Sequence, residues 1–167
     1  MSFRGLSLAL LLWVSSSAAW SQEFIVSKDL KFEIPEPAAI IHSGESVFLK
    51  YTDWSLSHTV LNPKTFYTGV DLTGLLEAYI RTIFEPEKSE LVNWLQFMAK
   101  EQAKAFKLTD KNTQKVSLGN FTLYSVFDSS DKNGHIFLVG KDYISHFNIL
   151  SDKKNYSNFI KLLKGRL

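Results

Sequence analysis

The sequence predicts an α+β fold: a mainly antiparallel sheet, two consecutive central helices, and a C-terminal helix packed on the sheet. Three patterns support this prediction. β-Branched and aromatic residues dominate short stretches before residue 62 and again after residue 115, as is typical of strands. Between Leu72 and Phe106, apolar residues recur at three- to four-residue intervals, which is the spacing of one helix face. The same spacing returns in the last residues of the chain.

The region before residue 62 is expected to form strands. Residues 24–34 (FIVSKDLKFEI) end at Pro35, which has no backbone N–H to donate to a sheet. Residues 46–54 (SVFLKYTDW) follow Gly44, a turn signal. Residues 59–61 form a third, shorter candidate. We therefore expect two or three strands ahead of the helices.

Two consecutive helices are predicted between residues 71 and 106. Asp71 is a suitable N-cap for the first, because its carboxylate can accept hydrogen bonds from the first turn. Pro86 ends this helix and suits the first position of the next, since its φ is fixed near the helical value. The expected buried faces are Leu72, Leu75, Leu76, Tyr79, Ile80, Ile83 and Phe84 in the first helix, and Leu91, Trp94, Leu95, Met98 and Phe106 in the second.

Strands are expected again over residues 116–127, 135–140 and 143–150. The intervening stretch 128–134 (DSSDKNG) is rich in turn-forming residues, and Asn133 and Gly134 tolerate the positive φ of tight hairpins. The last helix is predicted to begin at an N-cap, either Asp152 or Asn155. Its apolar face comprises Tyr156, Phe159, Ile160 and Leu163.

Residues 1–21 have the composition of a signal peptide. Arg4 precedes the uncharged stretch 6–14 (LSLALLLWV), and small residues follow. They offer one cleavage site ahead of Gln22 and a second possible site defined by Ser17 and Ala19. An uncleaved anchor is disfavoured because a nine-residue helix spans roughly 13 Å against a hydrocarbon core of about 30 Å. We expect residues 22–167 to form a single exported domain, located in the periplasm or, alternatively, secreted.

Composition excludes several function classes. The chain contains no cysteine, which rules out thiolate metal sites, a thiol nucleophile and a lipid-modified N-terminal cysteine. An exported chain without cysteine favours a bacterial periplasm. Lys and Arg number 19 against 17 Asp and Glu, too even a balance to indicate nucleic acid as a partner. No catalytic or metal-binding motif occurs, so we expect no enzyme activity, cofactor or metal.

Two groups of residues are candidates for binding. Lys100, Lys104, Lys107 and Lys111 recur at near-helical spacing and could contact an anionic partner, although a solvated helix end explains them as well. The second group mixes large aromatic with polar side chains, as protein interfaces and carbohydrate sites do. It comprises Tyr51, Asp53, Trp54, His58, Phe66 and Tyr67. The alternative is that Trp54 closes one end of the core.

The order of elements resembles the PsbP-like α/β/α sandwich proteins. In those proteins an opening strand runs into proline, as in KFEIPEP here. A central segment leads into a long helix, as in NPKTFYTGVDLTGLLEAYI, and a β-meander precedes a closing helix, as in LGNFTLYSVF to YSNFIKLL. The resemblance implies a non-catalytic accessory protein and transfers no functional residue.

These observations predict a non-enzymatic periplasmic protein that acts by binding another protein. It would be an accessory factor or an immunity-type inhibitor of a toxin that acts on the cell envelope. The alternative is a binder of a small molecule, envelope glycan or lipid through the same aromatic residues. A third hypothesis is a hydrolase that uses His58 and Asp53.

Overall fold

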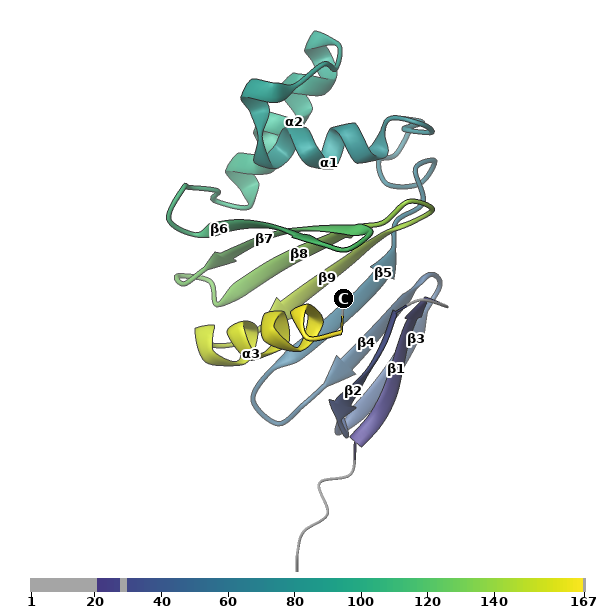
Figure 1. The fold of residues 1–167 in the computed structure, drawn as a ribbon, viewed down its shortest axis with the longest axis vertical. Helices are drawn as coiled ribbons and strands as arrows, with labels where there is room; N and C mark the ends of the chain where they lie inside the picture. Colours follow the sequence, from purple (N-terminus) through teal and green to yellow (C-terminus); the bar gives the residue numbers. More distant parts are fainter. Residues whose placement is uncertain (1–20, 28–29, 167) are drawn as a thin grey trace, which may run out of the picture.

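The computed structural model describes residues 21–27 and 30–166, and it confirms the predicted α+β class (Figure 1). One antiparallel sheet has seven strands in the order β3-β4-β5-β9-β8-β7-β6, and β1 pairs with β2 in a separate two-stranded sheet. The predicted signal peptide, residues 1–21, lies outside the described residues except for Ser21.

The strands are β1 (Ser21–Ser27), β2 (Leu30–Pro35), β3 (Ala39–Ser43), β4 (Ser46–Lys50), β5 (Ser55–Val60), β6 (Thr113–Leu118), β7 (Phe121–Asp128), β8 (Asn133–Val139) and β9 (Ile144–Leu150). The helices are α1 (Leu76–Phe84), the 3₁₀ helix η1 (Pro86–Lys88), α2 (Asn93–Ala105) and α3 (Lys153–Lys164).

The prediction of one strand over residues 24–34 is wrong. The segment is a hairpin in which β1 pairs with β2, with Phe24 opposite Phe32. β2 alternates regularly, so Leu30, Phe32 and Ile34 are buried. β1 ends at Ser27 and β2 begins at Leu30, so the two strands are too close in sequence to be told apart by their composition, and this explains the error.

The next three strands also differ from the prediction. β3 was not expected; all five of its residues are exposed, so it carries no alternating pattern. β4 ends at Lys50, because a turn in which the Tyr51 N–H donates to the Trp54 carbonyl (2.9 Å) separates it from β5. β5 extends over six residues rather than the three expected.

Both central helices begin later than predicted. Gly74 has φ +76°, outside the right-handed helical region, so α1 begins at Leu76 and Leu75 is left 42 % exposed. Asp71 instead accepts a hydrogen bond from the Thr73 N–H (2.8 Å) in a local turn. Pro86 opens only the 3₁₀ helix η1, and α2 begins at Asn93.

The C-terminal half follows the prediction more closely. Residues 116–127 are not one strand, because Gly119 with φ +56° forms the turn between β6 and β7. In the following turn the positive φ belongs to Lys132, whereas Asn133 and Gly134 open β8. Asp152 caps α3 by accepting from the Asn155 N–H (2.7 Å). The predicted face of α3 is buried as expected.

The large sheet separates two apolar cores. The β1–β2 hairpin and α3 pack on one face, around Phe32, Phe147 and Phe159. The pair α1 and α2, inserted between β5 and β6, packs on the opposite face, around Tyr79 and Phe137 (Figure 1). Any site on this molecule therefore lies on the α3 side or on the α1–α2 side of the sheet.

Candidate functional site

Tyr51 and Trp54 form one end of the core on the α3 side. Their rings stack with centroids 4.0 Å apart and planes at 2°. Tyr51 is buried, and burial raises the pKa of its hydroxyl to about 12. Trp54 is half-buried and borders a shallow groove of about 270 Å³ with Pro35 and Leu162. This pair has the structural role that the alternative interpretation assigned to Trp54, and it also leaves part of the indole accessible.

His58 lies in the middle of β5 and is buried. Its Nε2 lies 3.2 Å from the Ser145 hydroxyl, and its ring packs against Phe24 and Phe147. Burial lowers the pKa of His58 to about 4, so the ring is neutral near pH 7. Asp53 is exposed in the turn before β5. The His58 ring therefore contacts a serine and two phenylalanines, and the structure does not bring it together with Asp53 among its described hydrogen bonds.

Phe66 and Tyr67 lie on the opposite side of the sheet. Tyr67 donates a hydrogen bond to Gln102 Oε1 (2.7 Å), and its hydroxyl lies 3.0 Å from that of Tyr79. Phe66 packs edge-on against Tyr67 (4.8 Å between centroids). The structure thus brings Tyr51 together with Trp54, and Phe66 together with Tyr67, but it does not gather all six sequence-predicted residues in one site.

Helix α2 presents an aromatic surface that sequence reasoning missed. Trp94 is 53 % exposed and Phe97 is 63 % exposed. The two residues are three positions apart and so neighbour each other on the helix. Lys100 and Glu101 follow on the next turn of this exposed side. We call Trp94 and Phe97, with these two flanking charges, the α2 surface.

The prediction that Trp94 is buried is wrong. The buried positions of α2 are Leu95 and Ala99, and Leu91 just before the helix is buried as well. Leu91, Leu95 and Ala99 are four residues apart, so they form one narrow stripe that packs against α1. Trp94 and Phe97 lie outside this stripe. The sequence did carry a signal for this: α2 has more large apolar residues than one narrow buried stripe can hold. The aromatic pair is therefore exposed on a helix that is held in place by its buried residues Leu95 and Ala99.

The predicted basic stripe is partly neutralised. Lys104 pairs with Glu101 (2.6 Å), and Lys107 pairs with Asp128 (2.6 Å) and Asp131 (2.8 Å). Hydrogen bonds from Lys107 and Ser130 are the main reason that the pKa of Asp128 lies well below its ordinary value. Lys111 lies apart from these pairs, at the edge of a pocket beside α3. Contact of these lysines with an anionic partner stays a prediction.

His135 and His146 belong to a polar row on the α1–α2 face. His135 Nδ1 lies 3.1 Å from His146 Nε2, and Asn148 donates to Asn133 Oδ1 (2.7 Å). Burial lowers the pKa of His135 to about 4 and, together with the neighbouring histidines, that of His146 to about 3. Among the described residues, no group of three or more His, Asp or Glu side chains could hold a metal ion. The contacts of this row connect β8 to β9.

Glu85 joins the end of α1 to the sheet. Its carboxylate accepts hydrogen bonds from Lys88 (2.5 Å), Lys115 (2.5 Å) and Tyr124 (3.2 Å). Burial alone would raise the pKa of Glu85, but these three hydrogen bonds outweigh burial and lower it to about 2. The interaction fixes the helical pair, and with it the α2 surface, on β6 and β7.

No family model, curated protein or solved structure matches this chain. The resemblance to PsbP-like proteins therefore stays a prediction. Within residues 21–27 and 30–166, none of the helices is long and apolar enough to cross a membrane.

Proposed function

We propose that this protein is a non-enzymatic exported protein that binds another protein through the α2 surface. The observation that carries the proposal is the pair Trp94 and Phe97, both more than half exposed on one side of α2. Exposing two large aromatic side chains to water is unfavourable unless a partner covers them. Tryptophan is also among the residues that contribute most to binding energy at protein interfaces.

The α2 surface supports this function better than the six residues chosen from sequence. Tyr51 and His58 are buried, and Tyr67 is hydrogen-bonded inside the molecule. α2 is anchored by Leu95 and Ala99, so Trp94 and Phe97 are held in place before binding. A preformed surface loses little conformational entropy when the partner arrives. The adjacent Lys100 and Glu101 can supply the polar rim that interfaces need.

The proposed partner is a protein of the cell envelope. The chain would be an accessory factor or an immunity-type inhibitor of an envelope-acting toxin, located in the periplasm or, alternatively, secreted. This proposal rests on the leader-like composition of residues 1–21. The N-terminal sequence of the protein from a periplasmic extract tests it. A mature chain that begins near Gln22 is expected, and an intact chain with Met1 in the cytosol would contradict export.

An affinity capture from envelope extract tests the protein-binding function. The full-length protein should retain one or a few specific proteins, and Trp94→Ala with Phe97→Ala should weaken that retention by about thirtyfold or more. Phe48→Ala is the matched control, because Phe48 is also an exposed aromatic residue (45 %) but lies on β4. Trp54→Ala tests, for comparison, the binding site that was predicted from the sequence. Retention that survives the α2 double substitution, or no specific retention, would refute the proposal.

A further inference from the structure

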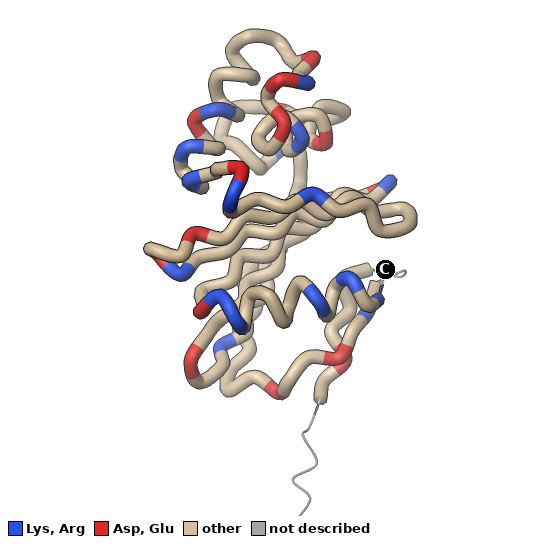
Figure 2. The backbone as a smooth tube through the Cα atoms, turned by 60° about the vertical axis from the view of Figure 1, so that its left-hand side comes forward, with Lys and Arg blue, Asp and Glu red and all other residues tan. Residues whose placement is uncertain are grey.

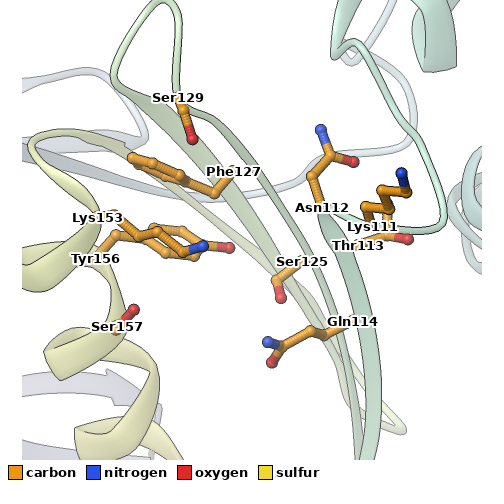
Figure 3. A pocket seen from close by; sticks show the side chains of 10 residues that line it. All are labelled: Lys111, Asn112, Thr113, Gln114, Ser125, Phe127, Ser129, Lys153, Tyr156 and Ser157. Atoms are coloured by element: carbon orange, nitrogen blue, oxygen red, sulfur yellow. The ribbon is translucent and has the colours of Figure 1, made fainter.

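A pocket separates α3 from strands β6 and β7, on the side of the sheet opposite the α2 surface. It has a volume of about 290 Å³. Figure 3 shows its walls: Tyr156 and Lys153 project from α3, and Ser125 and Gln114 face them from the two strands. Gly134 explains how α3 comes so close to β8, since the Tyr156 ring occupies the space where a Cβ of residue 134 would lie.

Tyr156 brings an unsatisfied polar group to this pocket. The residue is only 6 % exposed, and its hydroxyl is buried without a hydrogen-bond partner. Figure 3 shows that the hydroxyl end of the ring points into the pocket, towards Ser125. Burial raises the pKa of Tyr156 to about 12; the nearby Ser125 hydroxyl acts in the opposite direction without forming a hydrogen bond of normal geometry. Buried hydroxyls in native proteins normally have a partner, and this one has none although its ring borders a pocket.

The charge around the pocket is positive. Lys111 and Lys153 line it, no carboxylate does, and neither lysine is in an ion pair with any described residue. Lys153 is also the first residue of α3, where the helix dipole disfavours a cation. Figure 2 shows lysine positions along α3, which contains four lysines and no acidic residue. Both lysines could therefore pair with an anion that enters the pocket.

The pocket continues as a groove along α3. A neighbouring hollow of about 240 Å³ shares Gln114, Tyr156 and Ser157 with the pocket and adds Ile160, Lys161 and Lys164. Amide and hydroxyl groups therefore occupy the middle of the groove, and lysines lie towards both ends. This arrangement suits a ligand with many hydroxyl groups and at least one negative charge, and it disfavours an apolar ligand.

We propose that this groove is a binding site for an anionic sugar, that is, a sugar that carries a carboxylate or phosphate group. Lys153 and Lys111 would pair with the charged group, since charge-assisted hydrogen bonds are the strongest that a pocket can offer. Tyr156, Gln114 and Ser157 would bind the sugar hydroxyls. The volume lies at the lower end of the range for ligand pockets, which limits the pocket itself to one or two sugar units. The site is independent of the α2 surface.

Amide chemical shifts of the full chain, titrated with defined probes, test this site. Glucuronic acid and glucose 6-phosphate should shift signals of residues that line the groove, and they distinguish a carboxylate from a phosphate ligand. Glucose and inorganic phosphate are the reference probes, each with only half of the required chemistry. Both should bind at least about tenfold more weakly than the better of the two anionic sugars.

Matched variants separate a built site from general attraction to lysines. Lys153→Gln and Tyr156→Phe should each weaken binding of the better probe by about tenfold. Lys154→Gln should leave it unchanged, because Lys154 is the next residue of α3 but does not line the pocket. Lys153 is exposed, so its substitution leaves the fold intact and keeps the test valid if Tyr156→Phe behaves poorly. Absence of shifts at millimolar probe, an equal effect of Lys154→Gln, or phosphate binding as tightly as glucose 6-phosphate would overturn the proposal.

Discussion

Replacement of Gly134 by alanine should destabilise the protein through one identifiable contact. A Cβ at position 134 would lie 2.3 Å from Cδ2 and Cε2 of Tyr156 and 3.2 Å from Cδ2 of Phe127. The Tyr156 ring cannot simply rotate away, because it is buried and packs against Phe127 at a centroid distance of 4.8 Å. The added methyl group therefore forces α3 or β8 to move.

The size of the effect is set by two opposing contributions. Overpacking a well-packed interior costs about 1–3 kcal/mol. Alanine recovers about 0.5–1 kcal/mol over glycine in a strand, because the unfolded chain has fewer conformations to lose. The overpacking cost is larger, so we expect a net loss of about 1–2 kcal/mol. For a chain of this size, that corresponds to a fall in Tm of about 2–8 °C.

Urea unfolding followed by circular dichroism measures this loss. Gly165→Ala is the matched control, because a Cβ there would meet nothing closer than 3.5 Å and the residue has φ −78°. Its free energy of unfolding should change by less than about 0.5 kcal/mol. Combining Gly134→Ala with Tyr156→Leu should cost less than the sum of the single substitutions. An unchanged midpoint for Gly134→Ala, or strictly additive losses, would refute the assigned contact.

Three further predictions follow from buried polar groups. Tyr156→Phe should raise the free energy of unfolding by about 1 kcal/mol in urea titrations without ligand, because it removes a buried hydroxyl that has no partner. A fall of similar size in the free energy of unfolding would contradict this reasoning. His58, His135 and His146 have pKa values below the ordinary 6.5 of histidine, so the unfolded chain binds protons more readily. The free energy of unfolding should therefore be highest above about pH 6.5 and fall towards pH 4. At pH 5 the loss should be on the order of 1–2 kcal/mol per histidine. Equal urea midpoints at pH 7 and pH 5 would argue against this prediction. Glu85→Gln should cost about 1–3 kcal/mol at pH 7 because Lys115 and Lys88 lose a partly buried anionic partner. That cost should shrink as wild-type Glu85 becomes protonated between about pH 4.5 and 2, and thermal melts of both proteins across this range check it.

Local sequence patterns predicted an element correctly where that element contained all the features that define it. α3 has a cap at Asp152, an apolar face at helical spacing and no competing breaker, and its prediction is confirmed. The fold class followed from the same kind of evidence repeated along the chain. Hairpins were less predictable, since the strands of β1–β2 and of β6–β7 follow each other so closely in the sequence that each pair was predicted as one strand. Gly119 was the available signal for the second of these turns.

The candidate sites depend on tertiary packing, which sequence patterns do not encode. The exposure of Trp94 follows from where α2 begins and from which stripe packs against α1. The α3 pocket takes Lys111, Ser125 and Tyr156 from three separate segments, so no motif marks it. The residues chosen around Trp54 lie close together in the sequence, but the chain crosses to the other face of the sheet after β5. Tyr51 and Trp54 therefore pack in the core on the α3 side, and Phe66 and Tyr67 pack in the core on the α1–α2 side.

The last strand of the chain, β9, lies in the middle of the large sheet, between β5 and β8. A growing polypeptide therefore cannot join its two groups of strands until β9 has been synthesised. The β5–β9 pairing connects positions as distant as Leu56 and Ile149, and such long loop closures make folding slow. The large sheet is therefore completed only after β9 has been made, whereas hairpins such as β3–β4 and β7–β8 can pair earlier.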